Sequence, residues 1–263
     1  MSRRSYGWRP DMPDRRDYKY VAPAHIKALL RPPSADLRIS GFEPAIWDQL
    51  TIGSCTAHGV GQAEYFCRAK ARKSRLFRPS RLKIYYDARV IEGTVKWDAG
   101  AEIRDGIKVL AKKGVCPEGL WPYKNVNIKM FKKPSANCYT EAVKHKALSY
   151  WRVAQTPTDM KECLIEGYPI VVGFTVYTSF DTEEMENTGI GVMPQQGDQF
   201  LGGHAVAVVG YNDEGNVWVL RNSWGTNWGQ GLPNGTRGYF TLPYEYLLDP
   251  DLASDFWTVR TSN

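Results

Sequence analysis

The sequence predicts an α+β protein in two parts, with helices in the first half and mostly antiparallel strands in the second. Apolar residues recur at helical spacing only before about position 145, and strand-like runs rich in β-branched residues follow it. Of the 263 residues, 43% are hydrophobic and 13% aromatic, which suffices for a large core. Sites often lie between two such parts, so we expect one at their junction.

Three helices are predicted in the first half, over residues 56–71, 80–92 and 101–113. The second has the clearest ends, because Ser80 is a typical N-cap and Gly93 a typical C-terminal stop. The third ends before Gly114. The chain from 118 to 137 is rich in polar residues and is predicted to be irregular.

The second half is predicted to form strands, with one short helix over residues 158–166 closed by Gly167. A hairpin turn, Asn-Asp-Glu-Gly at 212–215, joins two of the strands. The predicted strands are 148–153, 169–177, 204–211, 217–221, 238–242 and 256–260.

The net charge of +6 is concentrated at the N-terminus. Residues 1–31 carry eight Lys/Arg and three Asp, a balance of +5, so the remaining 232 residues carry only +1. This distribution argues against a nucleic-acid-binding body. Pro32-Pro33 ends any helix at the close of this basic segment, so we place a boundary there. We predict an N-terminal extension (1–31), a helical part (32–145) and a β-rich part (146–263).

No apolar run is long enough to span a membrane, and Ser2-Arg3-Arg4 is not followed by the apolar stretch of a signal peptide. The cytoplasm is therefore the default expectation, with export by another route left open. Five cysteines is an odd number, so at least one thiol is free or pairs between chains. In a reducing compartment we expect them to be reduced.

Cys55 is the candidate nucleophile. Gly53-Ser54 forms a turn that delivers it to the start of a helix, where the helix dipole and unpaired N–H groups favour the thiolate. A thiolate suits covalent chemistry. The alternative is an inert cysteine that opens a core helix, and a base is needed to decide between the two.

His204 is the candidate base, because it heads an apolar strand directly after Gly202-Gly203. The hairpin brings the next strand alongside, so Asn222 can accept the imidazole N–H and Trp224 can cover that contact. The other histidines are expected to be structural. His58, three residues after Cys55, does not make a metal site without further ligands. His25 lies in the extension, and His145 has no partner in sequence.

These residues resemble the papain/cathepsin family of cysteine proteases over about residues 34–245. The pattern of this family is a nucleophilic cysteine near the start of the mature chain, followed far downstream by a histidine and then an asparagine. The motifs are Gln49, Gly53-Ser54-Cys55, Gly203-His204-Ala205-Val206 and the run from Asn222 to Gly229, with Asp36-Leu37-Arg38, Trp121-Pro122-Tyr123 and Gly238-Tyr239-Phe240 beside them.

The resemblance implies a helical left domain and an antiparallel, β-barrel-like right domain with the cleft between them. It implies a thiol protease in which Cys55 attacks a peptide bond, His204 is acid and base, Asn222 orients His204, and Gln49 donates to the oxyanion. Trp224 would be a supporting residue. The expected substrate-binding residues are Gly100, Glu102, Gly203 and Trp228, with Glu102 favouring basic side chains. The partner is a peptide or protein substrate, we expect a monomer, and nothing demands a cofactor or metal.

The sequence departs from the family pattern in several places. Ile52 stands where members often have a cysteine and Thr56 where they usually have tryptophan, so the disulfide built on that missing cysteine cannot form. Only Ala99-Gly100 remains of the usual Gly-Gly, and 231–237 resembles an insertion near the cleft. Whether Cys116 and Cys138 pair is left open.

Residues 1–31 are too few for a long helical prodomain, and we hypothesise that they lie across the cleft as a short inhibitory prosegment. About thirty extended residues reach on the order of 100 Å, enough to cross it. A packed strap or a solvated tail is the alternative. Two other functions share the same motifs: acyl transfer to an amine, and a catalytically silent binding protein.

Overall fold

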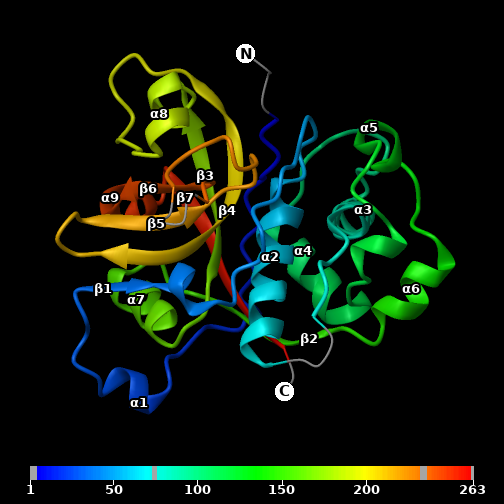
Figure 1. Cartoon of the computed structure of the whole chain (residues 1–263), viewed down its shortest axis with the longest axis horizontal. Coiled ribbons are helices and arrows are strands. Elements are labelled where there is room, and N and C mark those ends of the chain that lie inside the picture. The colour runs from blue at the N-terminus through cyan, green and yellow to red at the C-terminus, as the bar shows by residue number, and fades with distance from the viewer. Residues whose placement is uncertain (1–4, 73–75, 232–235, 262–263) are drawn as a thin grey trace.

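The computed structural model describes residues 5–72, 76–231 and 236–261. The helices between residues 81 and 142 gather on one side of the molecule, the sheet lies on the other side with the remaining short helices around it, and α2 stands between the two (Figure 1). The main helices are α2 (Cys55–Lys70), α3 (Arg81–Glu92), α4 (Ile103–Lys108), α6 (Ala136–Ala142), α7 (Pro157–Ile165), α8 (Glu183–Thr188) and α9 (Tyr244–Leu248), with short turns α1 (Ala24–Lys27) and α5 (Val126–Lys129). The fold is α+β, as the sequence predicts.

The sheet has seven antiparallel strands in the order β2-β7-β3-β4-β5-β6, with β1 paired to β4. In the described part of the chain this path stays open, so the sheet is barrel-like only in its curvature and does not close. The strands are β1 (Ser34–Asp36), β2 (Ala147–Arg152), β3 (Ile170–Tyr177), β4 (Phe200–Asn212), β5 (Val217–Arg221), β6 (Tyr239–Pro243) and β7 (Ala253–Thr261).

Helix α2 carries the candidate nucleophile and is buried on nearly every side. It packs against β4 and β7 of the sheet and against α3 and α4. Gly59 permits this contact, because a Cβ there would lie 3.2 Å from Cγ1 of Val171 in β3. The glycines that weaken the helical pattern of the sequence are thus explained by close packing.

The ends of the predicted helices agree with the structure, with one irregularity. The Ser80 side chain accepts from the Lys83 N–H, and Gly93 ends α3 in the left-handed region at φ 72°. The third predicted helix divides into α4 and a π-helical stretch, Val109–Lys113, that ends at Gly114. The predicted irregular region also contains short helices, α5 and the start of α6.

The strands of the second half agree with the predicted runs to within a few residues, and the turn at 212–215 joins β4 to β5. The sequence pattern does not predict β1, α8 or α9, because each is too short to show a clear period. Part of the insertion at 231–237 lies outside the described residues. The domain boundaries after residues 31 and 145 stay predictions.

The expectation of reduced cysteines is wrong for one pair. Cys116 and Cys138 form a disulfide across 22 residues of sequence, and both are fully buried. Cys55, Cys67 and Cys163 are free thiols, and each is also buried. The pairing could not be decided from sequence, because spacing alone does not say which side chains meet.

Candidate active site

The loop before α2 holds Cys55 at the first residue of the helix. The carboxylate of Asp98 accepts from the Gly53 N–H at 2.9 Å, and the Ser54 hydroxyl meets the Tyr123 hydroxyl at 2.6 Å. These contacts fix the turn, and they tie it to segments far along the chain. The Cys55 side chain is completely buried.

β4 carries His204 beside this helix terminus. A hydrogen bond from the Ala205 N–H lowers the pKa of Cys55, so the residue next to His204 in sequence contacts the candidate nucleophile. Nε2 of His204 lies 2.8 Å from Oδ1 of Asn222, and both side chains are buried. The indole of Trp224 stacks on the imidazole at 4.7 Å between ring centroids and covers it from solvent.

Gln49 is held between the loop before α2 and the residue after Asn222, and it is fully buried. Its Oε1 accepts from the Ser223 hydroxyl at 2.7 Å, which orients the amide. Its Nε2 donates to the main-chain oxygens of Ser5 at 2.9 Å and of Ile52 at 3.1 Å. The amide N–H groups therefore face a carbonyl of the N-terminal extension.

Residues 5–9 of the extension run through the site, between the helical side and the sheet (Figure 1). The Trp8 N–H donates to the Gly203 oxygen at 2.8 Å, and the Ala101 N–H donates to the Gly7 oxygen at 2.8 Å. The ring of Tyr6 meets the edge of the His204 imidazole at 6.3 Å.

The Gly7 N–H reaches the Cys55 thiol itself. Burial raises the pKa of Cys55, and hydrogen bonds from the backbone N–H groups of Ala205, Gly7 and Thr56 act in the opposite direction with less effect. With residues 5–9 in the cleft the thiol is thus desolvated and its protonated form is favoured.

The expected substrate-binding residues lie around this segment. Gly100 has φ 71°, and a Cβ there would lie 2.0 Å from the Gly7 oxygen, so only glycine fits. The Gly203 oxygen accepts from the Trp8 N–H. The backbone N–H of Glu102 donates to the carboxylate of Glu92, and that carboxylate also pairs with Arg9. Burial raises the pKa of the Glu102 side chain.

Trp228 lies farther from Cys55 and packs on Trp224 at 4.9 Å. It borders a hollow of about 560 Å³ beside the site, whose lining includes the acidic residues Asp48, Asp181, Glu183 and Glu186.

The other histidines are held by structural contacts. His58 is buried, its Nδ1 lies 3.0 Å from the Ser54 oxygen, and Arg81 lies 3.2 Å from its Nε2. Burial and then Arg81 lower its pKa well below the ordinary value. His145 contacts Glu141 at 3.1 Å, and His25 is exposed.

Sequence reasoning missed the residues that hold the extension in place. It gives no role to Asp11, Asp255 or Arg152, and it selects Gly100 where Ala101 makes the main-chain contact. One signal was present in the sequence. Tyr6 and Trp8 put two large aromatic side chains into a charged tail, and a solvated tail has no use for them.

Across residues 5–72, 76–231 and 236–261, no group of three or more His, Cys, Asp or Glu is arranged to hold a metal ion. Over the same residues, no helix has both the length and the apolar character that crossing a bilayer requires.

Comparison with known proteins places these features in a wider context. The sequence profile for the papain family of cysteine proteases matches residues 31–245. An uncharacterized peptidase C1-like protein of Acanthamoeba polyphaga mimivirus is 37% identical over 98% of this chain and 87% of its own length. Xylellain, a cysteine protease from Xylella fastidiosa, is 42% identical with a TM-score of 0.89, covering 100% of this chain and 99% of its own. Procathepsin B of Trypanosoma congolense shares the fold at 18% identity and a TM-score of 0.74, over 98% of this chain and 87% of its own.

Proposed function

Because the chain belongs to the papain family and is a papain-like cysteine protease, we propose that Cys55 is its nucleophile and His204 its acid and base. The observation that carries this assignment is the buried contact of 2.8 Å between His204 Nε2 and Asn222 Oδ1. A neutral amide oxygen that accepts the Nε2–H fixes the tautomer and leaves Nδ1 as the basic nitrogen, which we propose exchanges the proton with the thiol.

The reaction follows from this geometry. The Cys55 thiolate adds to a peptide carbonyl, and the Gln49 amide and the Cys55 backbone N–H donate to the oxyanion that forms. His204 protonates the departing amine, which leaves a thioester on Cys55. His204 then takes a proton from water, and the hydroxide equivalent releases the acid and regenerates the thiol.

We also propose that the full-length protein is latent, with residues 5–9 as a plug in the cleft. The plug contacts the candidate nucleophile, because the Gly7 N–H is among the backbone hydrogen-bond donors that lower the pKa of Cys55. The plug also engages the Gln49 amide through the Ser5 oxygen. Substrate and plug would therefore compete for the same donors and the same space.

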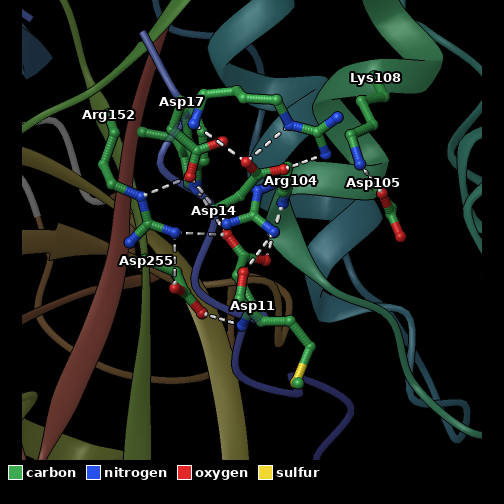
Figure 2. A network of polar contacts seen from close by, with 11 residues as sticks. Asp11, Asp14, Asp17, Arg104, Asp105, Lys108, Arg152 and Asp255 are labelled. Atoms are coloured by element: carbon green, nitrogen blue, oxygen red, sulfur yellow. Dashed lines mark hydrogen bonds and ion pairs between the residues drawn. The ribbon is translucent and has the colours of Figure 1, made fainter. Parts of the chain in front are cut away.

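Residues 11–20 act as an anchor for the plug. Asp11 is buried and accepts from the Trp257 indole N–H at 2.8 Å and from the Arg104 N–H at 3.1 Å. Its own N–H donates to Asp255 at 2.7 Å. Figure 2 shows how Arg152 joins Asp11 and Asp17 of this anchor to Asp255 of β7. The Arg104 side chain pairs with Asp17.

The anchor continues along the sheet edge. Tyr18 and Tyr20 exchange main-chain hydrogen bonds with Arg152 of β2 at 2.7 and 2.9 Å, and the Tyr20 side chain is buried. A segment held in this way belongs to the folded body. We therefore propose that activation displaces the plug alone, and that the anchor stays in place.

The test uses a chain that starts at Pro10, which lacks the plug, with fluorogenic peptides and an epoxide that alkylates cysteine. Hydrolysis that the epoxide and Cys55→Ala both abolish is expected, and chromatography of the products distinguishes hydrolysis from transfer to an amine. Activity that survives in Cys55→Ala would refute the assignment of the nucleophile.

Latency is tested separately by comparing the intact chain with a chain that starts at Pro10. Higher activity of the shorter chain, at equal stability, supports the plug. Equal activity of the two chains would contradict the proposed latency and would not affect the proposed peptidase function.

A further inference from the structure

Asp98 holds the turn that leads to the candidate nucleophile. Its carboxylate accepts from the Gly53 N–H, with Oδ2 at 2.9 Å and Oδ1 at 3.2 Å. A Cβ added to Gly53 would lie 3.3 Å from Oδ1, so the carboxylate packs directly against the turn. Position 52 carries isoleucine where members of the family often have a cysteine, so a hydrogen bond and not a disulfide ties this turn to residue 98.

The peptide group between residues 52 and 53 joins Asp98 to Gln49. Its N–H belongs to Gly53 and donates to Asp98. Its oxygen belongs to Ile52 and accepts from Nε2 of Gln49 at 3.1 Å. A peptide group is planar, so an acceptor that fixes the N–H also fixes the direction of the oxygen. The carboxylate of Asp98 therefore sets the position of the oxygen that the Gln49 side chain meets.

This contact determines where the second N–H of Gln49 points. A side-chain amide has one acceptor oxygen and two N–H donors on its nitrogen. The oxygen accepts from the Ser223 hydroxyl at 2.7 Å, and one N–H donates to the Ile52 oxygen. The other N–H is left for the Ser5 oxygen at 2.9 Å while the plug is bound. Once the plug leaves, the same N–H is available to an oxyanion.

Helix α3 holds Asp98 in turn. The Tyr85 hydroxyl donates to the Asp98 carboxylate and accepts from the Gly100 N–H at 3.1 Å. Arg89 is fully buried and donates to the main-chain oxygen of Trp97 at 2.7 Å. The carboxylate is thus placed by contacts on both sides of residue 98 and does not depend on its own loop alone.

We propose that Asp98 is a positioning residue for the Gln49 amide and acts through the peptide group before Gly53. This inference rests on the proposed peptidase function, in which Gln49 donates to the oxyanion. Donors of this kind stabilise a transition state because they are already oriented when the charge develops. Without its acceptor on Asp98, the peptide group loses its fixed direction, and the Gln49 N–H loses it as well.

Kinetics test whether Asp98 acts through Gln49. All chains are full-length and carry Gly7→Val, because a Cβ at position 7 would lie 1.9 Å from the Gly53 oxygen and displaces the plug. Asp98→Ala should lower kcat about fivefold to tenfold, and Gln49→Ala about 100-fold, as for the loss of an oxyanion donor. Added to Gln49→Ala, Asp98→Ala should lower kcat by less than about twofold more, because the group that it positions is gone. Losses that multiply in the double variant would overturn the proposal.

Asp98→Asn tests whether the acceptor or the charge matters. It keeps an acceptor oxygen and removes the charge, so it should recover most of kcat and leave the pH profile unchanged. A loss as large as in Asp98→Ala would show that the charge acts directly and would refute a positioning role. Glu214→Ala removes an exposed carboxylate from the turn between β4 and β5, and as the control it should change nothing.

Alkylation by iodoacetamide tests the alternative that Asp98 only holds Cys55 in place. The reaction of iodoacetamide with the thiolate forms no oxyanion. Its rate should therefore be the same in Asp98→Ala and in the parent Gly7→Val chain. A rate that falls in parallel with kcat would contradict the proposal, because the nucleophile itself would then have moved.

A spectroscopic readout separates the inference from the proposed function. Proton–nitrogen NMR spectra of the full-length chain without Gly7→Val contain two side-chain N–H signals of Gln49, which Gln49→Ala identifies by their loss. Asp98→Ala should move these signals, and Glu214→Ala should not. If no peptide is hydrolysed, the proposed function fails, and the spectra still decide the inference. Gln49 signals that stay in place in Asp98→Ala would refute it.

Discussion

The side-chain amide of Gln49 lies 2.9 Å from the main-chain oxygen of Ser5. The group expected to stabilise an oxyanion is therefore already engaged by a carbonyl of the same chain. Since the Gly7 N–H reaches Cys55 as well, the plug engages both the nucleophile and the oxyanion donor. The binding of residues 5–9 can therefore be weakened by a substitution that changes neither Cys55 nor Gln49.

Gly7→Val should increase the activity of the full-length chain. A Cβ at position 7 would lie 1.9 Å from the Gly53 oxygen, so a side chain there expels the plug. A loss of about 1.4 kcal/mol in docking already shifts the open population about tenfold while that population is small. Initial rates with a fluorogenic peptide test this against Gly119→Ala, a position with no atom within 4 Å of an added Cβ. Unchanged rates in Gly7→Val would count against the plug.

Asn222→Ala should lower kcat/KM by about 10- to 100-fold, mostly through a decrease in kcat. The imidazole loses the acceptor at 2.8 Å that fixes its tautomer, and positioned acid–base catalysis is worth about 10²-fold or more. The rate of epoxide labelling at Cys55 should fall in parallel. The exposed Asn137→Ala is the control, and an intact labelling rate in Asn222→Ala would contradict the assigned role.

Asp11→Ala should reduce the free energy of unfolding by about 3–5 kcal/mol, as for a broken buried ion-pair network. The Trp257 and Arg104 N–H groups lose their acceptor, and Arg152 loses one of its carboxylates. Urea denaturation measures the change. Asp14→Ala removes the surface ion pair with Arg16 and the acceptor of the Arg16 N–H, and it should change the free energy of unfolding much less. Similar midpoints for the two variants would show that the anchor is not integral to the body.

Stability should fall as the pH rises toward neutrality, partly through Glu92. Burial raises the pKa of Glu92 from 4.5 to about 7, so the folded protein holds this proton more tightly than the unfolded chain. The contribution is complete below pH 4.5 and is lost as the pH rises to about 7. Glu92→Gln cannot ionise and should flatten the profile in that window, whereas Glu184→Gln should not. Parallel profiles for wild type and Glu92→Gln would refute the assignment.

Replacing Cys116 and Cys138 by alanine should cost about 3 kcal/mol, the loop-entropy value for a closed loop of this length. The disulfide closes 22 residues that include α5 and joins α6 to the segment before it. Thermal unfolding compares the double variant with wild type in the absence of reductant. If wild type with added reductant stays as stable as without it, the bond contributes little.

The sequence allowed prediction of the features that depend on local pattern. Ser80 and Gly93 mark the ends of α3 because capping is a matter of a few adjacent residues. The approach of His204 to Asn222 followed from one short hairpin, whose turn residues are visible in the sequence. The catalytic roles of these residues stay predictions until activity is measured.

The features that could not be predicted depend on contacts between distant segments. One extra residue in β7, relative to β3, turns the Asp255 side chain toward Trp8. The alternation of apolar and polar residues along a strand does not show which of two paired strands carries such a bulge. The pocket for Trp8 requires glycines on two strands to face each other across the fold. Net positive charge is the visible feature of the extension in the sequence, although buried aspartates and aromatic residues make the contacts that hold it.

The bond from Trp8 to Asp255 spans 247 residues, and this has a consequence for the order of assembly during synthesis. Residues 5–9 leave the ribosome before every strand of the sheet, and their partner in β7 leaves after the other six strands. β7 lies between β2 and β3, so the sheet that carries His204 is incomplete until it arrives. Contacts of such sequence separation form late. We therefore expect the completed sheet that carries His204 and the contact between Trp8 and Asp255 to form in the same step, so that the proposed plug is in place as soon as the sheet is complete.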